Sequence, residues 1–126
     1  MNSHFLNPHG LTEPGQFSTA RDLAILARSA YGSPVLRRFM STKSITFRFN
    51  DGRTTTLKNT NRVLKSVDYC NGMKTGTTNA SGRCLVCSGS LNGRSVIVVV
   101  LKSNSANIWT DSEKLLRWSL ERSAAQ

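Results

Sequence analysis

The chain has 126 residues, 38% of them hydrophobic, and a formal net charge of +10. This length allows one domain with a modest core, and no apolar run comes near the roughly 20 residues that a transmembrane helix requires. The positive charge favours acidic partners, but the basic residues are scattered singly and in pairs. They form no aromatic-interleaved basic stripe of the kind that stacks single-stranded bases, so we expect no nucleic acid partner.

The sequence of residues 1–17 predicts an irregular segment that leads into the first helix; we call this segment the lead-in. Two turn-forming clusters, Asn-Pro-His-Gly at 7–10 and Glu-Pro-Gly at 13–15, account for most of it. The segment lacks the basic start and apolar stretch of a secretory signal peptide. His9 could act as a general base, but between proline and glycine we interpret it as a turn residue.

Apolar residues at helical spacing predict a helix over residues 19–31. Thr19 and Asp22 form a capping box at its start, and Gly32 ends it. Pro34 then opens a second, short helix.

The next segment, residues 44–57, predicts a β-hairpin. Apolar residues alternate with polar ones on its first strand, and Asn-Asp-Gly at 50–52 turns the chain into a β-branched second strand.

Residues 72–101 predict a three-stranded antiparallel sheet. Asn-Gly at 92–93 marks a tight hairpin between the last two strands. Residues 96–101 are apolar on both faces of their strand, so we expect this strand to lie centrally in a sheet that is covered on both sides. A central strand pairs along both edges, so the edge of this strand that faces away from its hairpin partner needs another strand. The three strands are expected near residues 73–77, 83–89 and 95–101.

The last predicted element is a helix over residues 110–122, which would cover one face of the sheet. Thr110 and Glu113 form a capping box, and leucines follow at helical spacing. We therefore interpret Asp22 and Glu113 as helix caps and not as a catalytic carboxylate pair.

Three cysteines, Cys70, Cys84 and Cys87, could suggest a zinc or redox site, because two of them form a Cys-x-x-Cys motif. On a strand, however, positions three apart point to opposite faces and cannot grip one ion together. We interpret all three as small buried thiols, and we expect neither a metal nor a cofactor.

The tetrapeptide Lys74-Thr75-Gly76-Thr77 combines groups that suit a substrate carboxylate. The lysine supplies positive charge and the first threonine a hydroxyl, while glycine lets a peptide lie close to the strand.

Four stretches occur in the order typical of the serine-type D-alanyl-D-alanine carboxypeptidases, the low-molecular-mass penicillin-binding proteins, and the chain resembles this family. They are Phe-Leu-Asn-Pro-His-Gly-Leu at 5–11, Ser-Thr-Ala-Arg-Asp-Leu-Ala at 18–24, Asn-Thr-Asn at 59–61 and Asn-Gly-Met-Lys-Thr-Gly-Thr-Thr at 71–78.

The resemblance implies an α/β (α+β) fold: a partial β-lactamase/transpeptidase-like fold with an antiparallel sheet and flanking helices. Residues 1–126 would be the C-terminal half of the catalytic domain, lacking the N-terminal strands and the nucleophile helix. The implied activity is removal of the terminal D-alanine from peptidoglycan stem peptides ending in D-Ala-D-Ala. The complete enzyme would bind β-lactams and lie outside the cytoplasm, facing the wall.

The resemblance also implies a role for each residue of the tetrapeptide. Lys74 would contact the terminal carboxylate and set the potential of the site, and the Thr75 hydroxyl would bind that carboxylate. Gly76 would permit close approach, and the Thr77 backbone N–H would be one of two oxyanion-hole donors.

The chain departs from the family pattern in having no Ser-x-x-Lys, the motif of the acylated serine. Ser90-x-Asn92 and Ser105-x-Asn107 match the second family motif only formally, because they follow Lys74, and we interpret them as turn residues. We expect the chain alone to be inactive and to self-associate through its exposed sheet edge. A non-catalytic remnant, or a module that binds D-Ala-D-Ala ends or anionic wall polymer, is the alternative.

Overall fold

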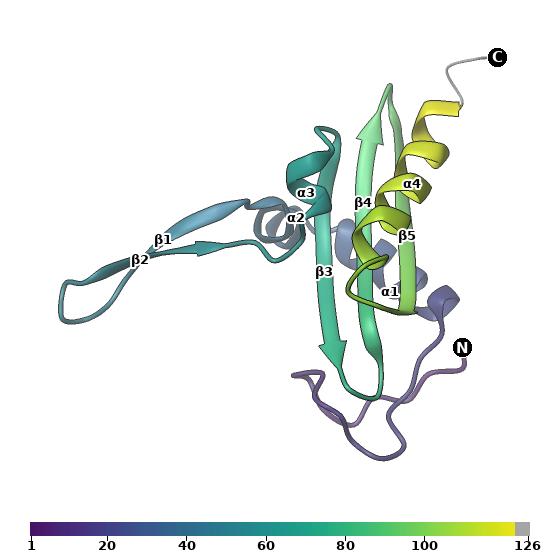
Figure 1. Ribbon diagram of the computed structural model, residues 1–126, viewed down its shortest axis with the longest axis horizontal. Helices are drawn as coiled ribbons and strands as arrows, with labels where there is room; N and C mark the ends of the chain where they lie inside the picture. The colour runs from purple at the N-terminus through teal and green to yellow at the C-terminus, as the bar shows by residue number, and fades with distance from the viewer. Residues whose placement is uncertain (123–126) are drawn as a thin grey trace.

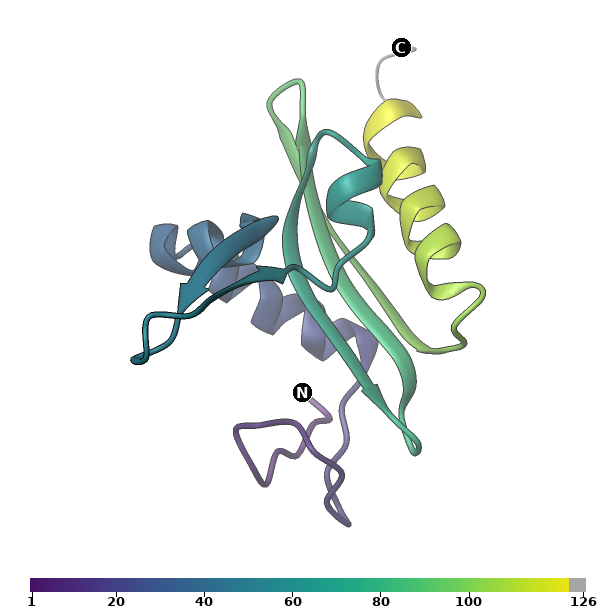
Figure 2. The same ribbon diagram turned by 60° about the vertical axis from the view of Figure 1, so that its left-hand side comes forward.

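A three-stranded antiparallel sheet lies at the centre of the computed structural model, which describes residues 1–122 (Figure 1). Its strands run in the order β3-β4-β5. Helices α1 and α2 lie on one face, and α3 and α4 on the other, as Figure 2 shows from a second direction. The strands are β3 Cys70–Thr78, β4 Gly82–Leu91 and β5 Arg94–Ser103, and the helices are α1 Ala20–Tyr31, α2 Pro34–Ser41, α3 Val63–Ser66 and α4 Ile108–Glu121.

The three predicted strands are confirmed, each extending one to three residues further than expected at its ends. The tight turn between β4 and β5 is also confirmed, because Asn92 and Gly93 both have positive φ, at 52° and 77°.

The prediction that residues 96–101 lie centrally is wrong for this chain, because β4 is the central strand and β5 an outer one. Helices α1 and α4 nevertheless cover the two faces of β5. This double cover explains why the run is apolar on both faces.

The start of α1 is confirmed, with one difference. The Thr19 hydroxyl accepts a hydrogen bond from the Asp22 N–H at 3.1 Å, as an N-cap does. The Asp22 carboxylate does not complete a capping box but accepts from the Asn2 N–H and the Ser3 hydroxyl, both at 2.6 Å. It therefore ties the largely irregular lead-in to the helix.

The predicted hairpin is confirmed as β1 Ser44–Arg48 and β2 Thr54–Lys58. It projects from the body of the molecule, and all ten of its strand residues are exposed (Figure 1). The helix expected to open at Pro34 is confirmed as α2, which Ser33 caps.

The predicted capping box at the start of the last helix is wrong. Helix α4 begins two residues earlier, at Ile108, which is 1% exposed in the core. The Asn104 side-chain oxygen accepts from the N–H groups of Ala106 and Asn107, so it shapes the turn that leads into the helix. Glu113, the predicted cap, instead accepts from the Ser66 hydroxyl at 2.7 Å and pairs with an arginine.

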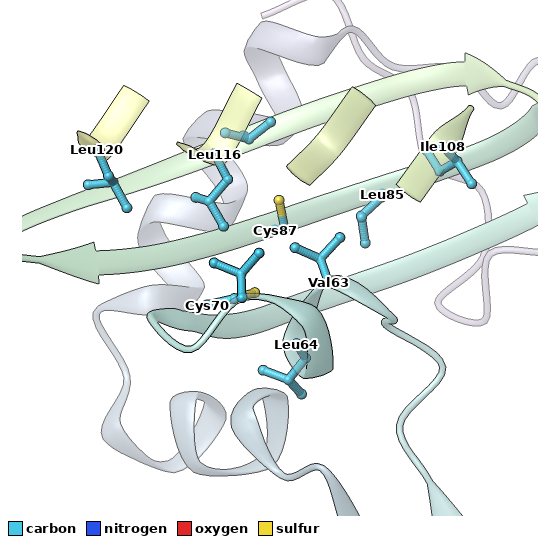
Figure 3. Packing of buried hydrophobic residues seen from close by; sticks show 10 residues of the cluster. Val63, Leu64, Cys70, Leu85, Cys87, Ile108, Leu116 and Leu120 are labelled. Carbon is cyan, nitrogen blue, oxygen red and sulfur yellow. The ribbon is translucent and has the colours of Figure 1, made fainter. Parts of the chain in front are cut away.

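The hydrophobic core lies between the sheet and the layer of α3 and α4 (Figure 3). Gly89 on β4 lets α4 approach closely, because an added Cβ there would lie 2.9 Å from the Tyr69 carbonyl oxygen and 3.1 Å from two leucines of α4. The short helix α3 was not predicted, since four residues are too few to show helical periodicity. The core residues are Val63, Leu64, Val67, Cys70, Leu85, Cys87, Val98, Ile108, Leu116 and Leu120.

None of the helices in residues 1–122 combines the length and apolar character needed to cross a membrane.

Candidate substrate-binding strand

The predicted site residues lie on the second half of β3, the outer strand of the sheet on the side opposite β5. Lys74, Gly76 and Thr77 are exposed, and Thr75 is half-buried. Because β3 pairs only with β4 among the described strands, one side of its backbone has no partner strand. This side can accept an extended peptide.

Gly76 has open space beside it, since an added Cβ would meet no atom within 4 Å. Internal packing therefore does not require a glycine here, in contrast to Gly89. The glycine leaves the strand surface flat where an incoming peptide would lie.

An open cavity of about 1090 Å³ borders this strand. All four sequence stretches that suggested the family contribute to its lining, although they are far apart in the chain. Figures 1 and 2 show the lead-in below the end of β3 at which the tetrapeptide lies. The lining residues from these stretches include Asn7, His9, Ser18, Leu23, Asn59, Thr60, Lys74 and Thr75.

The cavity is strongly basic. Five cationic side chains line it, and Glu13 is the one acidic residue in the lining. Within residues 1–122, no ion pair neutralises any of the five. Such a concentration of positive charge attracts a carboxylate. The five are Lys58, Arg62, Lys65, Lys74 and Arg83.

The Lys74 ammonium donates to the backbone carbonyl of Thr75, with an Nζ–O distance of 2.5 Å. The ammonium thus lies against the backbone of the residue whose side chain carries the neighbouring hydroxyl, and both residues line the cavity. A carboxylate bound here would meet both groups.

The loop at residues 59–61 holds β3 in place, a role that our sequence analysis did not assign. The side-chain N–H₂ of buried Asn61 donates to the Gly72 carbonyl at 3.1 Å, and its oxygen accepts from the Val63 N–H at 3.1 Å. The hydroxyls of Thr60 and Thr75 lie 2.7 Å apart in a hydrogen bond. Two asparagines flanking a hydroxyl residue were the only sequence signal for this loop.

The turn role predicted for His9 is confirmed. Its ring Nδ1 accepts from the Leu11 N–H at 3.2 Å, and the Asn7 side chain accepts from the Gly10 N–H at 2.8 Å. His9 therefore shapes the turn that closes one side of the cavity.

The cysteines do not all share one environment. Cys70 and Cys87 are buried as predicted, and burial raises the pKa of the Cys87 thiol to about 12. The prediction is wrong for Cys84, which is half-buried and lines the cavity beside β3. Within residues 1–122, no three metal-ligating side chains come together.

The comparisons with known proteins agree on one family. The sequence model described as Peptidase_S11: D-alanyl-D-alanine carboxypeptidase matches residues 1–105. The chain is 41% identical to D-alanyl-D-alanine carboxypeptidase DacC of Escherichia coli over 93% of its own length, and 35% identical to DacF of Bacillus subtilis over 82%. It spans only 29% and 27% of these relatives.

Solved structures give the same result for the fold. The chain matches the Streptomyces K15 DD-transpeptidase with a TM-score of 0.81 and 30% identity, covering 95% of this chain and 49% of that one. Penicillin-binding protein D2 of Listeria monocytogenes, in its cefotaxime-bound form, matches with a TM-score of 0.75 and 26% identity, covering 92% and 47%. The expected partial transpeptidase-like fold is thus confirmed, with its antiparallel sheet and flanking helices, and the chain belongs to the D-alanyl-D-alanine carboxypeptidase family.

Proposed function

We propose that residues 1–126 are the substrate-binding, C-terminal half of the catalytic domain of a serine-type D-Ala-D-Ala carboxypeptidase. The substrate would be a peptidoglycan stem peptide ending in D-Ala-D-Ala. The observation that carries the proposal is the largely exposed Lys74-Thr75-Gly76-Thr77 segment on an outer strand, which lines a basic cavity together with the other three family stretches.

In the proposed complex the peptide extends along β3, with its terminal carboxylate against the Lys74 ammonium and the Thr75 hydroxyl. Gly76 leaves room for its backbone. The Thr77 N–H would donate to the carbonyl oxygen of the penultimate D-alanine, where negative charge develops during attack.

The nucleophile would be a serine outside these 126 residues, because the sequence contains no Ser-x-x-Lys. Its Oγ would attack the carbonyl carbon of the penultimate D-alanine as its proton passes to a base. The peptide C–N bond would then break, and D-alanine would leave with a proton on its nitrogen. Water would hydrolyse the acyl-serine ester, releasing the shortened peptide and restoring the serine.

The same site would take β-lactams in the complete enzyme, as the cefotaxime-bound relative indicates. Because the substrate is a wall peptide, the working location would be outside the cytoplasm, facing the envelope.

A non-catalytic role is the second candidate, and the missing Ser-x-x-Lys is the observation that favours it. In that case the chain would bind D-Ala-D-Ala ends, or anionic wall polymer, without hydrolysis. Binding by the isolated chain does not separate the two candidates, so the test must supply a nucleophile.

The test is a chimera in which this chain replaces the matching segment of E. coli DacC. We expect it to release D-alanine from diacetyl-L-Lys-D-Ala-D-Ala and to form a one-to-one covalent adduct with benzylpenicillin in intact-mass spectra. Lys74→Ala should lower kcat/KM by about 100-fold or more, the scale for removing one electrostatic donor from an active site. Lys114→Ala is the matched control, since it removes an exposed lysine of α4 that does not line the cavity.

The isolated chain should keep its mass after exposure to benzylpenicillin. A chimera that folds, with a cooperative thermal transition, yet neither hydrolyses the peptide nor reacts with benzylpenicillin would contradict the carboxypeptidase proposal.

A further inference from the structure

We infer that Thr60 is a positioning residue, whose hydroxyl orients the Thr75 hydroxyl toward the carboxylate of the bound peptide. The inference rests on the proposed function, because it assigns a partner to the group that would bind the substrate. Thr60 does not belong to the Lys-Thr-Gly segment and lies fifteen residues before Thr75.

The contact between the two side chains is direct. The Oγ1 atoms of Thr60 and Thr75 lie 2.7 Å apart, a short distance for a hydrogen bond between hydroxyls. In the described part of the chain, neither hydroxyl has another hydrogen-bond partner. Both residues line the cavity, so the pair faces the space that a ligand would fill.

The count of protons determines the direction of this hydrogen bond when a carboxylate is bound. A hydroxyl has one proton to donate, and an ionised carboxylate can only accept. If Thr75 donated to Thr60, it would have no proton left for the carboxylate. A bound carboxylate therefore favours the arrangement in which Thr60 donates to Thr75 and Thr75 donates to the ligand. Hydrogen bonds in such a chain also polarise and strengthen one another.

The backbone around Thr60 is held on both sides, so its hydroxyl has a defined position. On one side, the Asn59 side-chain N–H₂ donates to the Thr42 carbonyl at 3.0 Å. On the other, the Asn61 side chain donates to the Gly72 carbonyl at the start of β3. The Asn61 N–H also donates to the Asn59 side-chain oxygen at 2.9 Å, closing the loop on itself. Thr60 is thus fixed relative to the strand that carries Thr75.

The experiment is an NMR titration of the full chain, following the ¹H–¹⁵N signals of Gly76 and Thr77. The two probes are diacetyl-L-Lys-D-Ala-D-Ala and the same peptide with its terminal carboxylate converted to an amide. The chain should bind the carboxylate peptide more tightly. Thr60→Val, which replaces the hydroxyl with a methyl group, should weaken that binding by about 2- to 10-fold, the range for one net hydrogen bond. Binding of the amide peptide should not change.

Three further variants make the result specific. Thr60→Ser should restore the binding lost in Thr60→Val, since serine keeps the hydroxyl. Thr56→Val, an exposed threonine of the hairpin, should have no effect. In a chain that already carries Thr75→Val, Thr60→Val should cause no further loss, because a positioning residue acts through its partner. If Thr60→Val fails to give a folded spectrum, Thr60→Ala takes its place.

The two proposals fail in different ways. Unchanged binding by a folded Thr60→Val variant would overturn the inference but leave the proposed function standing, provided that the parent chain prefers the carboxylate peptide. Equal losses in Thr60→Ser and Thr60→Val, or an additive loss with Thr75→Val, would also overturn it. A parent chain that binds neither peptide, or both equally, would overturn the proposed function and the inference with it.

Discussion

Cys84 and Cys87 lie three residues apart on one strand but in opposite environments. Cys84 is half-buried and lines the cavity beside β3, whereas Cys87 is completely buried under α4 (Figure 3). The alternation of side chains along β4 produces this difference. It prevents the Cys-x-x-Cys motif from gripping one metal ion.

This difference predicts that the three thiols react at different rates. At pH 8 in native buffer, we expect a thiol reagent such as DTNB to modify Cys84 rapidly and the two buried cysteines only on unfolding. Burial raises the pKa of Cys87 to about 12, so at pH 8 almost none of it is the reactive thiolate. Cys84→Ser should abolish the rapid phase. Two or more fast thiols in the native chain would contradict the burial of Cys70 and Cys87.

Two glycines on neighbouring strands predict opposite effects on stability. Gly89→Ala should lower the free energy of unfolding by about 1–3 kcal/mol, the usual range for overpacking a well-packed site. The added methyl would meet the Tyr69 carbonyl oxygen at 2.9 Å, and backbone atoms move less easily than side-chain ends.

Gly76→Ala is the matched control, since nothing lies within 4 Å of its added Cβ. Urea unfolding followed by circular dichroism should leave its midpoint unchanged or slightly higher, because alanine reduces the freedom of the unfolded chain. If both substitutions lowered the free energy of unfolding equally, close packing of α4 against Gly89 would not be the cause.

Local sequence chemistry predicted much of the fold. The two tight turns, at 50–52 and 92–93, contain asparagine and glycine, which adopt positive φ more easily than other residues, and Gly52, Asn92 and Gly93 do so here. The hairpins around these turns could therefore be predicted directly from the sequence. The start of α4 could not be predicted in the same way. Thr110 and Glu113 match a capping box, but burial of Ile108 and the turn at Asn104 place the helix start two residues earlier.

The same distinction applies to the site. The Lys74-Thr75-Gly76-Thr77 segment carries its chemistry in consecutive residues and could be recognised from the sequence alone. The contact between Thr60 and Thr75 could not, because it depends on how the loop at 59–61 packs against β3. Similarly, residues 96–101 were expected to lie centrally because they are apolar on both faces of their strand. An outer strand that is covered by a helix on each face requires the same apolar residues, so this pattern does not distinguish the two positions.

Acid should weaken the attachment of the lead-in to α1, because this attachment depends on the ionised Asp22 carboxylate. Hydrogen bonds from Ser3 and Asn2 hold the pKa of this carboxyl below its usual value. A lowered folded-state pKa means that the ionised group stabilises the fold above the ordinary pKa of about 3.9, and that this contribution is lost as the pH falls through the lower, folded-state value. Asp22→Asn should flatten the pH dependence of the unfolding free energy below about pH 4. An unchanged acid profile in the variant would show that Asp22 does not couple the lead-in to α1.

Self-association through β5 is the last prediction. In the described chain β5 pairs with β4 alone, so its other side presents unpaired backbone groups along a run of β-branched residues. Such an outer strand readily pairs with another chain. Light scattering should show a mass that rises with protein concentration.

The exposed hairpin is a competing contact surface, because Ile45, Phe47 and Leu57 are all exposed on it. Hydrogen exchange separates the two possibilities. If chains join through β5, the amides of residues 96–101 should exchange more slowly as the concentration rises, while those of the hairpin keep their rates. Slowing confined to the hairpin would assign the contact to its apolar face, and a monomer at high concentration would exclude both surfaces. Because strand pairing satisfies backbone hydrogen bonds while an apolar contact does not, the exchange pattern also identifies the force that joins the chains.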